Sequence, residues 1–274
     1  MRGAGGALDI EEKLNIVLEN FEEFEGALLS LALDRALFQQ GEWSSQIADL
    51  HSLNRRLVNL LATARLYIDQ VPHSLSLLFE TNREIPDAFD RMKSREYDGF
   101  VGYRAMEAVR NYMQHRSLPI HVISHNSRRL DRGTTPLLEQ TVNAVIHPHD
   151  YRGDGKFKAE VLKELETIGP NVDLPPLVRQ FVSCLGRIHT DLRGLLAPFE
   201  ASWDSVIKEC GDQFLAAGAS DLTGLVLVSL TGDRTYDVIV HIAPGPVIRR
   251  QELERKNRYV QHYERILVAN RPTG

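Results

Sequence analysis

The feature that most constrains the fold is a helical repeat of apolar residues near the start of the chain. Within residues 10–31, apolar side chains recur at spacings of three and four, and acidic side chains fill the positions between them. This is the pattern of an amphipathic helix with one buried face. Residues 45–70 repeat it with a second apolar edge, which indicates a helix in the centre of a bundle. The sequence therefore predicts a mainly α protein organised as a helical bundle.

Prolines and glycines indicate where the later helices should begin, bend and end. Pro72 predicts a kink or break near the end of the second helix. Pro86 suits the first turn of a third long helix that reaches His115. Gly99 and Gly102 lie inside this helix and indicate close packing or a bend. Further helices are expected over residues 156–168, 176–217 and 247–269.

Two short β segments interrupt the helical pattern. An apolar run at 120–123 and an alternating run at 138–146 flank the polar loop 126–133, which predicts an inserted β-hairpin. A second hairpin is expected at 225–242. The expected domains are a helical bundle over 8–217, with the hairpin inserted at 118–150, and a C-terminal hairpin with a basic helix over 218–274.

Composition narrows the class of protein. No run approaches the roughly 18 apolar residues of a membrane span, and the N-terminal residues lack the apolar stretch of a secretory signal. The two cysteines, Cys184 and Cys210, are far apart, which disfavours a disulfide framework or a structural zinc site and favours buried, reduced thiols. We therefore expect a cytoplasmic protein with no membrane association, no metal and no cofactor.

The charge is unevenly distributed along the chain. The formal net charge is −5, but residues 91–132 contain nine basic and four acidic residues. A local basic region of this kind can attract a phosphate-bearing ligand. The alternative is that these residues simply form solvated helix faces and a basic loop.

One group of residues within this basic region has side chains that are suited to catalysis. The sequence Arg110-Asn111-Tyr112-Met113-Gln114-His115 lies at the expected end of the third helix. Cleavage of RNA without a metal needs proton transfer, which suits histidine, and stabilisation of phosphate charge, which suits arginine. Asn111 and His115 are four residues apart and share a face. Arg110 lies roughly 140° around the helix from His115, so two copies of the helix across a twofold axis would bring both groups to one cleft.

This constellation resembles the motif of the HEPN superfamily, in which an arginine is followed after four to six residues by a histidine, often with a polar residue directly after the arginine. Arg110, Asn111 and His115 match the motif at its shortest spacing, and the long helices around it also fit. The resemblance covers residues 8–215. It implies a metal-independent endoribonuclease that leaves a cyclic phosphate, with a composite site at a homodimer interface, in a toxin, phage-defence or RNA-processing role.

The resemblance assigns Arg110 to the phosphate, His115 to proton transfer and Asn111 to orienting them. Arg116 and Tyr112 are candidates for RNA contacts, although a solvated charge and a core aromatic are the alternatives. The expected partners are RNA, a second copy of the chain and, through the C-terminal segment, another protein. Many members of the superfamily lack activity, so a non-catalytic interaction or dimerisation module is the rival hypothesis.

Two other groups of residues have alternative interpretations. His147, His149 and Asp150 have the residue types of metal ligands, which leaves a metal-dependent hydrolase as a third hypothesis. No fourth ligand is indicated by spacing, and a loop end is the favoured interpretation. Asn54, Asn59 and Arg65 interrupt apolar faces of the second helix, either as a polar shell around the motif or as residues that form hydrogen bonds on the helix surface or between helices.

Overall fold

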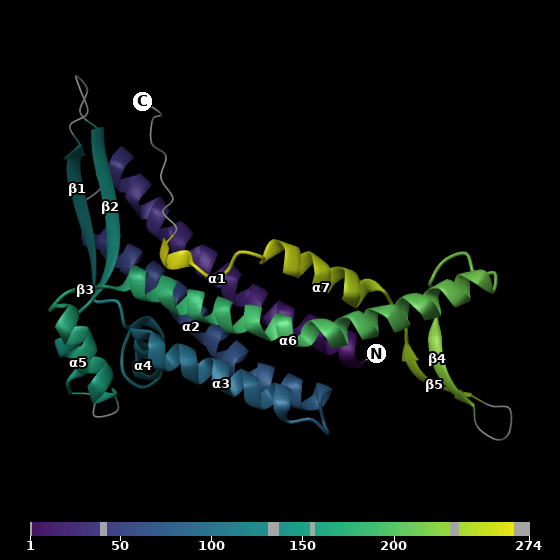
Figure 1. The fold of residues 1–274 in the computed structure, drawn as a ribbon. Helices are drawn as coiled ribbons and strands as arrows, with labels where there is room; N and C mark the ends of the chain where they lie inside the picture. Colours follow the sequence, from purple (N-terminus) through teal and green to yellow (C-terminus); the bar gives the residue numbers. More distant parts are fainter. Residues whose placement is uncertain (1, 39–42, 131–136, 154–156, 231–235, 266–274) are drawn as a thin grey trace. The chain divides into compact units, whose positions relative to one another are not determined.

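A computed structural model describes residues 2–38, 43–130, 137–153, 157–230 and 236–265. The described chain is mainly helical (Figure 1), which confirms the predicted fold class. The helices are α1 (Arg2–Phe38), α2 (Trp43–Leu78), α3 (Glu84–Gly99), α4 (Val101–His115), α5 (Ala159–Ile168), α6 (Leu174–Ala216) and α7 (Gly245–Lys256), with short 3₁₀ helices η1 (Pro148–Tyr151) and η2 (Tyr263–Arg265). The strands are β1 (Val122–Leu130), β2 (Leu137–Ile146), β3 (Val172–Asp173), β4 (Val226–Leu230) and β5 (Tyr236–His241).

The chain divides into two compact units, each assembled from segments that are distant in the sequence. The first unit comprises Met1–Asn15, Tyr67–Arg91 and His189–Arg258. The second comprises Ile16–Leu66, Met92–Ile188 and Tyr259–Gly274. The Arg-Asn motif (residues 110–115) and the inserted hairpin both belong to the second unit.

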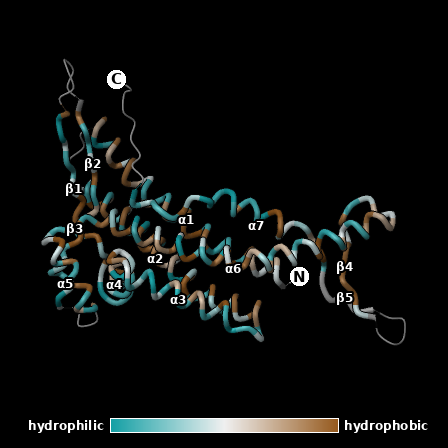
Figure 2. The backbone as a smooth tube through the Cα atoms, viewed as in Figure 1, coloured by the Kyte–Doolittle hydropathy of each residue, from teal (hydrophilic) through white to brown (hydrophobic). Residues whose placement is uncertain are grey.

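The core of the second unit follows from the apolar periodicity of its helices. Figure 2 shows hydrophobic and hydrophilic residues interleaved along α1, α2 and α6, as expected for helices with one buried face. The buried residues of this unit come from helices and from the hairpin; they include Phe24, Leu28, Leu53, Leu57, Leu60, Tyr103, Met106, Val109, Ile146, Val178, Phe181 and Leu185.

The expected third helix is two helices, α3 and α4, so the prediction of one long helix was wrong. Phe100 separates them in an extended conformation, with φ of −134° and ψ of 120°. The Arg187 guanidinium lies over the Phe100 ring at 4.2 Å from its centroid. Arg104 Nη1 donates to the carbonyl oxygens of Tyr97 at 2.5 Å and Asp98 at 2.8 Å, which satisfies the last turn of α3. The break is therefore contacted by Arg187 of α6 and by Arg104 of the first turn of α4.

Gly102, in the first turn of α4, packs closely against α6. Its backbone N–H donates to Gln180 Oε1 at 2.6 Å. A Cβ atom at this position would lie 2.7 Å from the Leu177 carbonyl oxygen and 2.8 Å from the Gln180 side chain. Of the two glycines noted in the sequence, Gly102 thus marks close packing, whereas Gly99 has open space around it.

The predicted inserted hairpin is present, with antiparallel pairing from Val122↔Val145 to Leu130↔Leu137. The polar loop expected at 126–133 was wrong in its first part, because β1 continues to Leu130; residues 131–133 lie outside the described chain. A polar cross-strand pair stabilises this part of the hairpin, because Ser127 Oγ donates to Gln140 Oε1 at 2.7 Å. The two-residue strand β3, which was not predicted, pairs with the end of β2.

Asn54 of α2 connects the helices to the start of the hairpin. Its amide Nδ2 donates to the Ile120 carbonyl oxygen at 3.1 Å, and its Oδ1 accepts the Ile120 N–H at 3.0 Å. Both residues are buried. Asn54 is thus a hydrogen-bonding residue, but its long-range partner Ile120 lies between α4 and β1 and not on another helix; the side chain fixes the segment that follows α4.

The first unit contains the remaining helical segments and the second hairpin. Its buried residues include Ile10, Leu14, Tyr67, Val71, Leu75, Phe89, Leu192, Leu196 and Leu253. Of the kink or break predicted at Pro72, the break is wrong, because α2 continues to Leu78. Burial of Val71 and Leu75 on one face favours a continuous helix over the cost of the missing N–H.

The C-terminal hairpin is present as the antiparallel pair of β4 and β5. The helix expected over 247–269 is shorter, because α7 ends at Lys256 and residues 266–269 lie outside the described chain. Asn257 terminates α7 in a buried position. Its carbonyl oxygen accepts from Arg193 at 3.1 Å and its Nδ2 donates to Asn15 Oδ1 at 3.3 Å, so side chains distant in sequence fix the turn.

A buried polar network lies inside the first unit. Arg193 donates to both carboxylate oxygens of Glu11 at 2.7 and 2.6 Å, and His189 Nε2 lies 2.9 Å from Glu11 Oε1. The other ring nitrogen of His189 is 3.0 Å from the Tyr67 hydroxyl. The Glu11, His189 and Tyr67 side chains are buried and hydrogen-bonded to one another. Removal of one of them would leave a buried polar group without its partner, which is costly in a low-dielectric interior.

Candidate functional site

The Arg-Asn motif occupies the last turns of α4, which ends at His115 as predicted. Arg110 is half-buried, whereas Asn111 and His115 are exposed. Arg110 Nη1 donates to Asn111 Oδ1 at 3.0 Å. A guanidinium can only donate, so this contact fixes the amide oxygen toward Arg110 and leaves the amide nitrogen to donate elsewhere. The structure therefore joins the first two members of the predicted site directly.

The buried face of α4 determines where these polar residues lie. Met106 and Val109 are fully buried, and the Tyr103 ring packs edge-to-face against Phe181 of α6 with centroids 5.3 Å apart. This apolar stripe holds the helix against the core of the second unit. The opposite face, which carries Asn111 and His115, is consequently left to solvent.

The two predicted substrate-binding residues differ in their surroundings. Tyr112 is half-buried and its ring packs edge-to-face against Tyr151 of η1, with centroids 4.7 Å apart. Arg116, just after α4, is exposed. The ring of Tyr112 thus has an internal packing partner, and Arg116 has the more accessible side chain.

Glu107, one turn before Arg110, is a half-buried carboxyl in basic surroundings. Burial raises the pKa of Glu107, and the positive charges of Lys158, Arg65 and Arg110 oppose this rise. Arg65 therefore lies near enough to α4 to act on the charge of Glu107.

Several side chains of the basic region are engaged within the fold. Arg104 forms two hydrogen bonds with Glu164 of α5, at 3.0 and 2.9 Å. Arg95 pairs with Glu96 at 2.7 Å. Both pairs neutralise part of the positive charge of the basic region, and the Arg104–Glu164 pair also joins α4 to α5.

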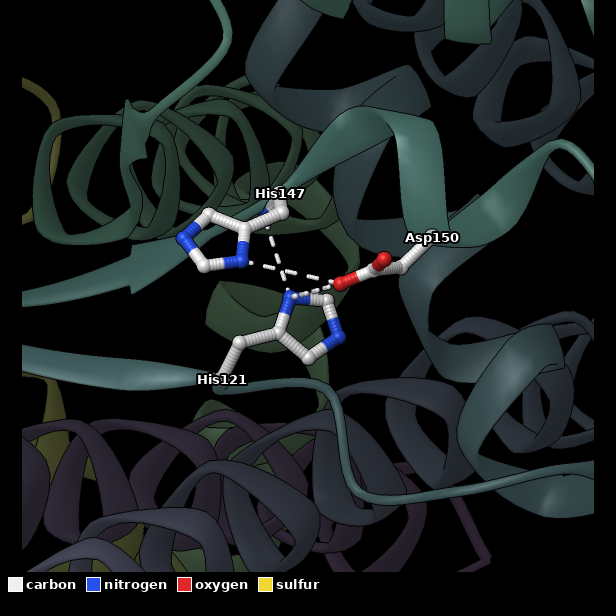
Figure 3. Close-up of side chains that lie close together, drawn as sticks. All are labelled: His121, His147 and Asp150. Atoms are coloured by element: carbon white, nitrogen blue, oxygen red, sulfur yellow. Dashed lines mark hydrogen bonds and ion pairs between the residues drawn. The ribbon is translucent and has the colours of Figure 1, made fainter.

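A second group of chemically competent residues lies at the base of the inserted hairpin (Figure 3). His121, His147 and Asp150 point toward one another, and their potential ligand atoms all lie within 4.8 Å. The sequence had indicated His147, His149 and Asp150, and the loop end expected there is the single turn η1. His121 was not included in that group, because its place beside His147 depends on the register with which β1 pairs with β2.

The environment of this group favours uncharged imidazole at His121. Burial lowers the pKa of His121, and the neighbouring His147 and His149 lower it further, while Asp150 opposes them. The ring of His121 stacks on that of His147 at a centroid distance of 5.3 Å. An uncharged imidazole is the form that accepts hydrogen bonds and binds metals.

The two cysteines have different surroundings. Cys184 is buried, and burial raises the pKa of its thiol to about 12, as expected for an unreactive residue. Cys210 is only half-buried, so the expectation of two buried thiols was wrong for this residue.

An apolar pocket of about 200 Å³ lies in the first unit, among the end of α6, the second hairpin and the start of α7. Its lining includes Ile207, Leu215, Leu222, Leu225, Ile242 and Val247. None of the motif residues contributes to it.

Comparison with protein-family models, with curated proteins and with solved structures finds no match to this chain. Among the described residues, no helix has both the length and the apolar character required to cross a membrane.

Proposed function

We propose that this chain is a metal-independent endoribonuclease of the HEPN type, with its reactive groups at the end of α4. The observation that supports the proposal most directly is the Arg110–Asn111 hydrogen bond beside an exposed His115 on the following turn. A charged donor, an orienting amide and a solvent-accessible imidazole are the groups that the reaction requires.

In the proposed reaction, the 2′-hydroxyl of a ribose attacks the adjacent phosphorus while the bond from phosphorus to the 5′-oxygen breaks. The 2′-hydroxyl proton leaves and the 5′-oxygen gains a proton, which gives a 2′,3′-cyclic phosphate and a 5′-hydroxyl. Imidazole of His115 is suited to these transfers. Arg110 stabilises the added negative charge on the phosphate oxygens, and the amide nitrogen of Asn111 is free of the Arg110 contact and can donate to the same phosphate.

A second copy of the chain is part of this proposal. Arg110 and His115 lie roughly 140° apart around a helix, so one rigid helix does not direct both at the same atom. Two α4 helices related by a twofold axis would place an arginine and a histidine from each copy around one groove. The exposure of Asn111 and His115 is compatible with this arrangement.

The test is incubation of purified full-length protein with mixed RNA in the presence of EDTA, followed by mass spectrometry of the product ends. We expect new cyclic-phosphate ends. His115→Ala should reduce the cleavage rate by about 10²- to 10⁴-fold, and Arg110→Ala by about 10²- to 10³-fold.

Gln114→Ala is the matched control, because Gln114 is an exposed neighbour in the same turn; its rate should stay near that of the unmodified protein. Circular dichroism checks that each variant is folded. Cleavage that survives both His115→Ala and Arg110→Ala would remove the assignment. Absence of cleavage by the unmodified protein would favour the rival function, a non-catalytic interaction module.

A further inference from the structure

The base of the inserted hairpin brings together three side chains from separate positions. His121 lies just before β1, His147 just after β2, and Asp150 in η1 (Figure 3). The His121 N–H donates to the Val145 carbonyl oxygen at 3.0 Å, which continues the hairpin ladder and sets His121 beside His147. The Asp150 N–H donates to the His147 carbonyl oxygen at 3.1 Å and turns the carboxylate back toward both rings.

The distances from the Asp150 carboxylate to the two imidazoles suit a shared cation, and all the potential ligand atoms of the cluster lie within 4.8 Å of one another. Asp150 Oδ2 lies 3.6 Å from His121 Nδ1 and 3.6 Å from His147 Nδ1. A tetrahedral metal with bonds of about 2.1 Å to nitrogen and oxygen separates its ligand atoms by about 3.4 Å. Movements of a few tenths of an ångström would therefore bring these pairs to bonding geometry.

The Asp150 carboxylate is already oriented for this role. His149 Nε2 lies 2.9 Å from Asp150 Oδ1, which leaves Oδ2 to face the two other imidazoles. Hydrogen bonding of the outer carboxylate oxygen is how proteins commonly fix a metal-binding carboxylate. The His121 and His147 side chains are 18% and 24% exposed and that of Asp150 is 40% exposed, so the cluster is sheltered but open to solvent on one side.

One contact competes with a metal. The backbone N–H of His147 donates to His121 Nδ1 at 2.9 Å and occupies the lone pair that a cation would use. A cation bound through Nδ1 must displace this N–H, and leaving a sheltered donor unpaired weakens binding by about 10- to 100-fold. Metal–imidazole and metal–carboxylate bonds together exceed this loss, so binding is reduced and not prevented.

We propose that His121, His147 and Asp150 bind a divalent transition-metal ion of the zinc class. Two imidazoles and one carboxylate are ligands that suit zinc and its neighbours. Three protein ligands leave at least one coordination position for water or another oxygen ligand, as in metal sites that act on a substrate. This site is independent of the proposed RNA cleavage, which needs no metal.

The experiment uses full-length protein freed of metal with a chelator and then dialysed. Zn²⁺ is titrated by calorimetry, and Co²⁺ is titrated as a spectroscopic probe whose visible absorption reports tetrahedral coordination. We expect one ion per chain. Asp150→Asn, His147→Gln and His121→Gln should each weaken binding at least tenfold, whereas His51→Ala, at an exposed position on α2, should leave it unchanged.

These substitutions are chosen to preserve the fold. Asp150→Asn keeps the size of the side chain, and His147→Gln keeps the backbone N–H that bonds to His121. Failure of the unmodified protein to bind Zn²⁺ at neutral pH would overturn the proposal, as would unchanged affinity in Asp150→Asn and His147→Gln. Loss of binding in His149→Gln with full binding in His121→Gln would overturn the assignment of His121. None of these results affects the cleavage assay in EDTA.

Discussion

At the scale of single residues, Glu11 in the buried network of the first unit makes the stability of the fold depend on pH. Burial alone raises the pKa of Glu11, but the hydrogen bonds and charges of Arg193 and His189 outweigh it and lower the pKa to about 2 from an ordinary value of 4.5. A carboxyl with a lowered folded-state pKa stabilises the fold above the unfolded-state pKa. That stabilisation is lost as the pH falls from 4.5 toward 2.

The corresponding prediction concerns Glu11→Gln, which removes the carboxylate but keeps the shape. The variant should lose about 3 kcal/mol of unfolding free energy at neutral pH. It should also lose less further stability than the unmodified protein as the pH falls from 4.5 toward 2. Urea denaturation at a series of pH values measures both effects. The matched control is Glu12→Gln, at the exposed neighbouring position, and an identical acid dependence in both variants would contradict the argument.

At the scale of elements, the position of α4 depends on Gly102. This helix carries the motif, and its first turn lies against the backbone of α6 with no room for a side chain. A methyl group would lie 2.7 Å from the Leu177 carbonyl oxygen, and a backbone atom cannot move aside as the end of a long side chain can. The two helices would have to separate, which disturbs the packing of Tyr103 against Phe181.

We therefore expect Gly102→Ala to lower the unfolding free energy by about 1–3 kcal/mol. Gly99→Ala is the matched control, because nothing lies within 4 Å of a Cβ at that position. It should be neutral or stabilise by up to about 1 kcal/mol, since alanine favours helix more than glycine does. Thermal and urea unfolding of the two variants provide the comparison. Equal stability of both variants would show that the α4–α6 contact tolerates a methyl group.

The elements also show which parts of the fold follow from local sequence. The helices and both hairpins were predicted because apolar periodicity is a local property. Gly99 and Gly102 indicated a bend or close packing there, but the complete break at Phe100 was not predicted; the Phe100 ring contacts Arg187, which is distant in the sequence. The same reason applies to His121, whose proximity to His147 and Asp150 depends on strand register and on the turn at η1. Contacts that the chain makes only after folding account for these omissions.

At the scale of the whole molecule, the proposed function depends on pairing of two chains. If the active groove contains Arg110 and His115 from both copies, then neither single variant retains a complete set. Mixing Arg110→Ala protein with His115→Ala protein should form heterodimers whose groove has one arginine and one histidine. Part of the RNA cleavage should return.

This complementation is measured by unfolding, mixing and refolding the two variants together, followed by the cleavage assay in EDTA. Light scattering after size-exclusion chromatography gives the number of chains per particle. Each variant refolded alone is the control and should stay inactive. A protein that remains a single chain at assay concentrations, or that regains no activity on mixing, would contradict the composite site.

The Asn54 amide has a consequence for recognising distant relatives. This side-chain amide pairs with the backbone of Ile120 in the way that a neighbouring strand would: Nδ2 donates to the carbonyl oxygen and Oδ1 accepts from the N–H. Aspartate at this position would set oxygen against oxygen, and leucine would leave two sheltered peptide groups unsatisfied. A protein that contains an arginine and a histidine five residues apart by chance does not need an asparagine at this place in an earlier helix. We therefore expect asparagine at the equivalent of position 54 in proteins that share this connection between α2 and the inserted hairpin.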